Sequence, residues 1–301
     1  MQLLLFLILY PVLWCISMLP FRLLYIVSDL AYLLVYYAIR YRRRIVRNNL
    51  ELAFPLLSKQ ERLVIERRSY RHLCDMFLEM IKTMTISEKE ITKRFTVANI
   101  EIYEELEKKN KSIALFCGHY ASYEWAISMN NYINFEGFAI YKRIANRHFD
   151  KLVRDIRSRF KAHLITTKET IPTIEKNQAA GILGVYGFAS DQSPKASKAF
   201  HWAPFMGITT PVHTGAEMLA KKFDMNVIFL IVKKVRRGYY EATLELLADN
   251  PRELPNYQIT ERFLRRIEQQ IYAAPEYYLW THKRWKHQKE SEAVIKGVTT
   301  S

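Results

Sequence analysis

Two long apolar runs occupy the first forty residues and are separated by a short break. Residues 3–19 carry no charged side chain, residues 23–39 carry only Asp29, and Pro20-Phe21-Arg22 lies between the runs. Together they exceed the ~20 apolar residues that cross a bilayer as a helix. We predict that residues 1–40 form a helical membrane anchor, which either spans the bilayer or lies along its interface. The alternative is a pair of buried helices in a soluble protein, because each run is short and Asp29 is costly in lipid.

The rest of the chain alternates helical and strand patterns. Apolar residues at helical spacing occupy residues 58–84, 123–132, 149–160, 215–222 and 260–273. Short apolar or alternating runs typical of strands occupy residues 112–117, 181–186, 226–232 and 239–247. This alternation predicts an α/β fold with a mixed, largely parallel central sheet flanked by helices. Since no internal repeat or long linker interrupts it, we predict one domain over residues 41–290 and a tail over residues 291–301.

The chain is strongly basic, with a formal net charge of +15 over 301 residues. Such a charge favours a polyanionic partner, which is nucleic acid, anionic lipid or an acidic carrier protein. The first basic cluster follows the apolar runs directly and comprises Arg40, Arg42, Arg43, Arg44 and Arg47. By the positive-inside rule this cluster keeps the following domain in the cytoplasm. Because membrane attachment explains the charge and no nucleic-acid-binding motif is present, we predict no nucleic-acid partner.

The cysteines and glycines give little support to metal or cofactor chemistry. The three cysteines, Cys15, Cys74 and Cys117, are widely spaced in apolar runs, which suggests neither a disulfide framework nor a zinc site. The sequence lacks the His-Glu-x-x-His pattern of metalloproteases and has no glycine-rich phosphate loop. Residues 187–191 fall short of a nucleophile elbow because Asp191 stands at the final glycine position. We therefore predict no metal and no cofactor.

His119 and Glu124 form the clearest candidate catalytic pair. The predicted strand 112–117 ends at Gly118, where open α/β sheets place their sites. Five residues of continuous helix turn through about 500°, so the two side chains meet only if His119 lies in the loop before a helix. An imidazole can take a proton from a hydroxyl near neutral pH, and a carboxylate can fix its tautomer. The alternative is a structural histidine, because a His and a Glu five positions apart are common by chance.

Five segments in order resemble the lipid A (lauroyl/myristoyl-type) acyltransferase family, within the wider glycerolipid acyltransferase group with its His-x-x-x-x-Asp/Glu motif. They are His119 to Glu124, residues 141–160, residues 189–194, residues 204–215 and residues 275–286. In the second segment Lys142-Arg143 replaces the family's usual Arg-Pro, which blurs the role of each basic residue.

The resemblance implies transfer of a fatty acyl chain from an acyl thioester to a hydroxyl of a lipid A precursor or a related membrane glycolipid or lysolipid. The donor would be acyl carrier protein or acyl-CoA. The location would be the bacterial inner (plasma) membrane, with the catalytic domain on the cytoplasmic face. His119 would act as the base, Glu124 would hold its imidazole, and Arg157 would bind phosphate or support the oxyanion. The competing hypothesis is a non-catalytic membrane protein that binds or transports lipid.

The remaining candidate residues would bind substrate. They are Tyr141, Arg143, Asn146, Asp150, Arg154, Asp191 and Arg284. Most have a structural alternative. Asn146 could cap a helix whose dipole Asp150 favours, the arginines could lie on a solvated face, and Asp191 could belong to a turn. Arg284 lies in a basic, aromatic stretch that also suits membrane headgroups.

Overall fold

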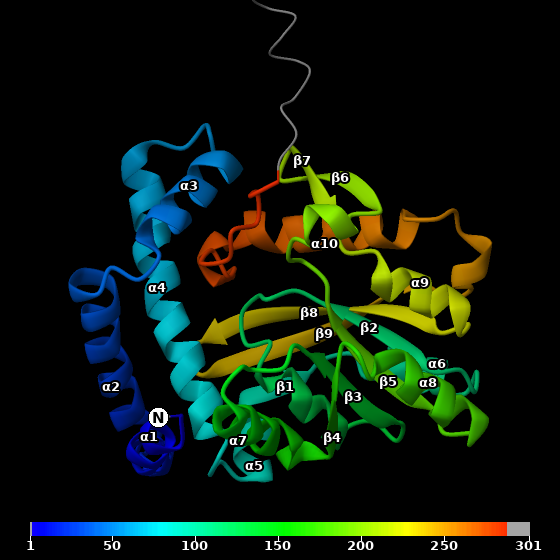
Figure 1. Cartoon of the computed structure of the whole chain (residues 1–301), viewed down its shortest axis with the longest axis horizontal. Coiled ribbons are helices and arrows are strands. Elements are labelled where there is room, and N and C mark those ends of the chain that lie inside the picture. Colours follow the sequence, from blue (N-terminus) through cyan, green and yellow to red (C-terminus); the bar gives the residue numbers. More distant parts are fainter. Residues whose placement is uncertain (1, 288–301) are drawn as a thin grey trace, which may run out of the picture.

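A seven-stranded sheet forms the centre of the structure, which is a computed structural model that describes residues 2–287 (Figure 1). The predicted tail over residues 291–301 lies outside the described residues. The strands are β1 (Phe95–Val97), β2 (Ile113–Cys117), β3 (Glu136–Tyr141), β4 (Ala162–Thr166), β5 (Gly184–Ala189), β8 (Asn226–Arg236) and β9 (Tyr239–Ala248). A separate hairpin pairs β6 (His201–Phe205) with β7 (Ile208–Val212).

The strand order is β1-β9-β8-β2-β5-β3-β4, with β2 in the middle. Strands β8, β2, β5, β3 and β4 are mutually parallel, whereas β9 runs antiparallel to β8 and β1 runs parallel to β9. The predicted mixed, largely parallel α/β fold is therefore confirmed. β2 is nearly continuous in apolar residues because it is covered on both faces, and its residues from Ile113 to Phe116 are buried.

The helices cover both faces of this sheet and one side of the domain (Figure 1). They are α1 (Gln2–Met18), α2 (Phe21–Leu33), α3 (Arg43–Ala53), α4 (Lys59–Lys82), α5 (Glu88–Arg94), α6 (Glu101–Glu107), α7 (Arg147–Arg157), α8 (Thr170–Ala179), α9 (Gly215–Lys222) and α10 (Gln258–Ala273). A π-helix, η1 (Leu34–Ala38), continues α2, and short 3-10 helices include η2 (Trp125–Asn131), η3 (Ser158–Phe160), η4 (Ala196–Lys198), η5 (Pro251–Glu253) and η6 (Pro275–Tyr277).

Two predicted elements differ from the observed ones. The strand predicted at residues 181–186 begins three residues later, because the chain turns at Gly181 with φ +68° and pairs with β3 only from Gly184 on and with β2 only from Val185 on. The predicted helix 123–132 is the 3-10 helix η2, preceded by a left-handed residue, Ala121. Strands β1, β3, β4, β6 and β7 were missed; β1 has three residues, and β4 alternates polar with apolar side chains at the sheet edge.

The two N-terminal apolar runs form helices that pack against the domain on one side and leave the other side exposed. Helix α2 runs along α4. Helix α4 itself begins with a capping box formed by Ser58 and Glu61. Among the described residues, Phe21–Ala38 is the helical stretch long and apolar enough to cross a membrane, judged by length and composition. Many large apolar side chains of α1 and α2 are exposed, so the alternative of two buried core helices is wrong.

Candidate active site

The sheet register brings His119 and Asp191 together. Cys117 at the end of β2 pairs with Ala189 at the end of β5, and each candidate residue lies two positions beyond its strand. The Nδ1 atom of His119 lies 2.7 Å from Oδ1 of Asp191, which is fully buried. This is the edge at which the carboxyl ends of parallel strands form sites in open α/β sheets.

Gly118 allows the loop after β2 to lie against α10. A Cβ atom at this position would stand 2.4 Å from Cδ1 of Ile267, a side chain that is itself completely buried. A larger residue would therefore push the loop away from α10 and move His119 with it. The glycine before the histidine is thus explained by packing rather than by an unusual backbone angle.

Glu124 contacts Arg157 and not His119. Its two carboxylate oxygens accept hydrogen bonds from Nε of Arg157 at 2.9 Å and from Nη2 at 2.6 Å. The expected contact with His119 is wrong because the loop turns at Ala121 and directs Glu124 to the end of α7, while Asp191 takes the Nδ1 position of the imidazole. Bidentate arginine–carboxylate pairs are among the stronger charge-assisted contacts. The site therefore holds two ion pairs, His119–Asp191 and Glu124–Arg157.

The electrostatic surroundings favour the charged forms of both pairs. Burial lowers the pKa of His119, but the charge and hydrogen bond of Asp191 and the charge of Glu124 outweigh it, and the pKa lies above its usual 6.5. Burial raises the pKa of Asp191, and the interaction with His119 reverses this, leaving the pKa below its usual value. Burial likewise opposes the charge of Arg157, but Glu124 raises its pKa overall. Arg157 is therefore a permanent cation.

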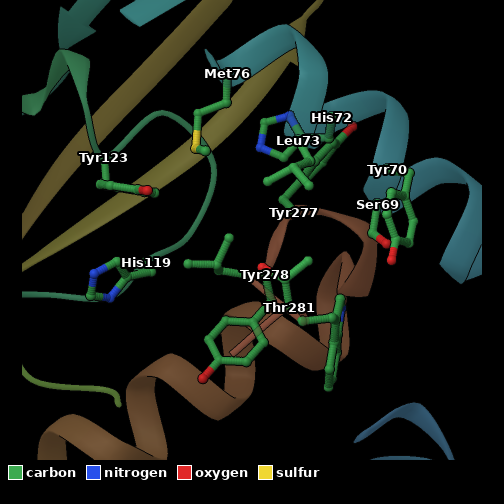
Figure 2. A pocket seen from close by; sticks show the side chains of 12 residues that line it. Ser69, Tyr70, His72, Leu73, Met76, His119, Tyr123, Tyr277, Tyr278 and Thr281 are labelled. Atoms are coloured by element: carbon green, nitrogen blue, oxygen red, sulfur yellow. The ribbon is translucent and has the colours of Figure 1, made fainter. Parts of the chain in front are cut away.

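A narrow, mostly apolar pocket begins at His119. Figure 2 shows His119 and Tyr123 at one end and Ser69 and Tyr70 at the other. Between them lie His72, Leu73 and Met76 of α4 and, from the C-terminal segment, Tyr277, Tyr278, Leu279, Trp280 and Thr281. The cavity volume is about 20 Å³, which holds little more than one water, so a ligand requires side-chain movement. The pocket lies between α4 and the C-terminal segment.

The C-terminal segment 275–286 forms one wall of the site through backbone contacts. The amide of Leu279 donates to the carbonyl of His119 at 3.1 Å, and the amide of Ala121 donates to the carbonyl of Tyr277 at 2.9 Å. His282 lies nearby and accepts from the amide of Ser193 at 3.3 Å. Burial lowers the pKa of His282 to about 4, so it is neutral and acts as an acceptor at neutral pH.

Arg284 lies inside the protein. It is 1% exposed, and its Nη1 atom donates to Ser193 at 3.0 Å, to Thr210 at 3.1 Å and to the carbonyl of Pro211 at 3.2 Å. Its guanidinium also stacks over the ring of Phe205. Such burial gives Arg284 no access to membrane headgroups and keeps it out of the pocket lining. Its contacts fasten the C-terminal segment to the β6–β7 hairpin.

The segment from Tyr141 to Arg154 supports the site at a distance from the pocket. Asn146 caps α7 by accepting from the amides at positions 148 and 149. Asp150 accepts from the amide of Ile144 at 2.8 Å and from the Tyr141 hydroxyl at 3.2 Å. Arg143 lies 3.8 Å from Asp150 with an exposed side chain, and Arg154 is exposed on α7. Of the candidates in this region, Arg157 is the one that reaches the His119 loop.

Sequence reasoning missed several residues of the site. Tyr123 packs edge-on against His119, with ring centres 5.0 Å apart, and it stands within the His119-to-Glu124 motif, which was the available signal. His72 and Met76 lie on a buried face of α4. A histidine in such a helical pattern is as consistent with a core residue as with a functional one, so the sequence did not single it out.

Across residues 2–287, no cluster of three or more His, Cys, Asp or Glu side chains is placed to hold a metal ion.

Comparisons with known proteins agree over nearly the whole chain. The family model described as "Bacterial lipid A biosynthesis acyltransferase" matches residues 2–287. The lipid A biosynthesis palmitoleoyltransferase of Escherichia coli (strain K12) is 23% identical over 292 residues, covering 94% of this chain and 92% of that protein. The lipid A biosynthesis lauroyltransferase of the same strain is 22% identical over 281 residues, covering 93% and 90%. Because the family model spans the described fold and site, the chain belongs to the bacterial lipid A biosynthesis acyltransferase family and is an acyltransferase.

Proposed function

We propose that the protein transfers a fatty acyl chain from an acyl thioester to a hydroxyl of a lipid A precursor, with His119 as general base. The observation that carries this proposal is the His119–Asp191 pair at one end of an apolar pocket, near the fixed Arg157. The names of the relatives agree with this substrate class. A non-catalytic lipid carrier would not need a base held by a fully buried carboxylate.

The chemistry follows from the imidazole geometry. Asp191 accepts the Nδ1–H of His119, which leaves Nε2 with a lone pair for the proton of the acceptor hydroxyl. The alkoxide oxygen attacks the thioester carbonyl carbon and forms a tetrahedral intermediate. When the intermediate collapses, the C–S bond breaks, and the leaving thiolate takes the proton from the His119 imidazolium. General-base help of this kind accelerates a reaction by roughly 10²- to 10⁴-fold.

Arg157 is the proposed anion-binding group, and Glu124 orients it. Glu124 occupies Nε and Nη2 of the guanidinium, and the remaining N–H donors can bind a phosphate of the acceptor or the developing oxyanion. The Arg157 side chain is 22% exposed, so it is reachable, while its partner is 7% exposed and fixed. Glu124 thus acts through Arg157 in this proposal, not through His119.

The pocket is the proposed site of the acyl chain of the donor. Leu73, Met76, Leu279 and Trp280 give it an apolar lining next to the base. The net charge of +15 suits an acidic acyl carrier protein as donor, with acyl-CoA as the alternative. We propose that the enzyme works at the cytoplasmic face of the inner membrane, where such a donor and a membrane lipid acceptor meet.

The test is acyl transfer by purified enzyme in mixed micelles, with acyl carrier protein thioester and a lipid A precursor. His119→Ala should lower kcat by at least ~10²-fold, because it removes the general base. The matched control is His163→Ala, since His163 lies on the edge strand β4 with a half-exposed side chain, and this variant should keep wild-type activity. Wild-type enzyme that binds lipid but transfers no acyl group, or full activity of His119→Ala, would refute the catalytic role.

A further inference from the structure

Helix α2 is fastened to α4 along its whole length by polar side chains. The contacts, from the start of the helix to η1, are Tyr25 with Glu79 at 2.8 Å, Ser28 with Asp75 at 2.7 Å and Tyr36 with Glu66 at 3.0 Å. All three carboxylates are buried. The buried side of α2 thus carries Ser28 and tyrosine hydroxyls beside the apolar Leu24, whereas an ordinary surface helix of a soluble protein buries a mainly apolar side.

Asp29, the single charge within the second apolar run, belongs to the same attachment. Its carboxylate binds Nη1 and Nη2 of Arg237 at 3.1 and 2.7 Å, and Arg237 also binds Asp75. Arg237 lies in the turn between β8 and β9, so the ion pairs join α2, α4 and the sheet. Next in that turn, Gly238 approaches Tyr25 so closely that a Cβ atom would stand 2.0 Å from the tyrosine oxygen.

The corner between α1 and α2 and the start of α1 are also attached. Lys82 at the end of α4 donates to the carbonyls of Ser17 at 2.7 Å and Leu19 at 2.9 Å. Near the other end of α1, Phe6 packs against the rings of His148 and Phe149 in the first turn of α7. A hairpin that crossed the bilayer would have to release these contacts at one end or the other.

Helix α4 cannot follow α2 into a bilayer. Its charged residues include Glu66, Arg67, Arg68, Arg71, Asp75 and Glu79. If α2 left α4 in order to span, the buried Glu66, Asp75 and Glu79 would lose hydrogen-bond partners, and the tyrosine hydroxyls and Asp29 would enter hydrocarbon. Both losses oppose a spanning arrangement.

The outward faces of the two helices carry the apolar surface. Leu4, Ile8 and Met18 of α1 and Ile26, Leu30 and Leu34 of the α2–η1 stretch are between 56% and 63% exposed. In Figure 1, α2 is viewed from the side along α4, whereas α1 is viewed nearly along its axis, so the helices do not form an antiparallel membrane hairpin. Arg22 and the exposed members of the first basic cluster stand at the two ends of α2, where they can reach phosphates.

We propose that α1 and α2 lie flat in the membrane interface, as a fixed docking surface that keeps its polar side on α4 and inserts its apolar side into one leaflet. The occupant of this surface is an anionic lipid bilayer. This inference rests on the membrane association proposed above and does not depend on the roles of His119 and Arg157.

The segment that follows the docking surface contacts residues that line the pocket. The Tyr70 hydroxyl donates to the carbonyl of Tyr41, and Nη1 of Arg42 donates to the carbonyl of Thr281 at 3.2 Å. Tyr70 and Thr281 line the pocket, and Tyr41 and Arg42 follow shortly after η1. In the proposed arrangement, a helix held in the interface therefore keeps this side of the pocket next to the leaflet that holds the lipid acceptor.

Spin labels at single cysteines in full-length protein on vesicles of phosphatidylethanolamine and phosphatidylglycerol test the proposal. The background is Cys15→Ser alone, because burial raises the pKa of Cys74 and of Cys117 to about 12 and leaves both unreactive. Labels replace Leu23, Ile26, Leu30 and Leu34 in turn. A Lys176→Cys label on α8 marks the aqueous control, since this residue is exposed on a different helix.

Collisions with oxygen and with a water-soluble nickel chelate report the depth of each label. A flat helix places all four labels at one depth, roughly 5–10 Å below the headgroups. A spanning helix separates positions 23 and 34 by about 16 Å in depth, at 1.5 Å per residue, and that result overturns the proposal while leaving the transfer chemistry intact. Water exposure of all four labels, as at position 176, also overturns it and would argue against membrane docking altogether.

A second measurement guards against labelling artefacts. The double variant Leu30→Lys/Leu34→Lys should weaken vesicle binding by about tenfold or more, since lysines within an apolar interface are costly. The matched control is Ile171→Lys/Ile182→Lys, which changes two exposed isoleucines at or beside α8 and should bind vesicles like the wild type. Equal binding of both double variants would contradict the assigned surface.

Discussion

Replacing Asp191 with asparagine tests the role of the buried carboxylate most directly. The side chain has nearly the same shape and is fully enclosed, so the substitution changes charge and hydrogen bonding with little effect on packing. An asparagine amide can donate to Nδ1 of His119, and that contact would move the imidazole proton to Nε2, the atom that must accept the substrate proton. The variant therefore holds the histidine in the wrong tautomer.

The magnitude follows from what the base contributes. Loss of a correctly oriented base should lower kcat by roughly 10²- to 10⁴-fold. The upper value is the effect of the same carboxylate-to-amide change in the serine protease triad. The KM for the acyl donor should change little, because Asp191 contacts the histidine and does not line the pocket. Donor and acceptor titrations of the purified enzyme give both constants.

The pH dependence supplies a second readout. His119 must be neutral to accept a proton, and Asp191 raises its pKa against the lowering effect of burial. Wild-type kcat should therefore rise with pH as His119 loses its proton. In Asp191→Asn the burial effect remains without the opposing charge, so this limb of the profile should move to lower pH.

The control for this substitution is Asp155→Asn, an exposed carboxylate on α7 paired with Lys151. It should leave kcat and the pH profile unchanged. An Asp191→Asn enzyme with normal far-UV circular dichroism, wild-type kcat and an unmoved acidic limb would refute the assignment of Asp191 to His119.

Three further substitutions address the other parts of the site. Arg157→Lys keeps the charge but loses the bidentate contact with Glu124, and kcat/KM for a phosphorylated acceptor should fall by about tenfold or more, measured against the same acceptor without phosphate. Met76→Trp should narrow the pocket and shift donor preference to shorter acyl chains, measured with a chain-length series; an unchanged series would argue against this pocket as the acyl site. Gly238 has φ +74° and lies against Tyr25, so Gly238→Ala should lower the free energy of unfolding by roughly 1–3 kcal/mol. The same change should loosen α2 from α4 and increase the labelling of a cysteine placed at position 24, which is buried when α2 packs on α4.

Local pattern was enough to predict much of the fold. The helix at residues 215–222 is α9, the helix at residues 260–273 ends where α10 ends, and the strand at residues 112–117 is β2. These elements have strong apolar periodicity and clear turn residues at their ends, which are properties of a short stretch of sequence. The edge strands β1 and β4 carry weaker local signals and were missed, and the 3-10 helix η2 was predicted as an ordinary helix.

The partner of His119 could not be obtained in this way. Glu124 is near in sequence, and Asp191 is 72 positions away, yet Asp191 makes the contact. What decides it is the register of β2 against β5, which aligns Cys117 with Ala189. Strand register depends on the packing of whole elements, so a single sequence suggests that Asp191 lies at the same sheet edge but does not assign its partner.

Asp29 shows how the same limit affects the reading of the N-terminal segment. In the sequence it counts against membrane contact, because an isolated carboxylate is costly in lipid. In the structure it faces Arg237 on the polar side of α2, whereas Leu30 next to it is exposed on the apolar side. The charge therefore does not oppose membrane contact; it opposes spanning. Because Arg237 also binds Asp75 of α4, its ion pair with Asp29 holds α2 on α4 and, in the proposed arrangement, keeps the apolar side of α2 turned toward the leaflet.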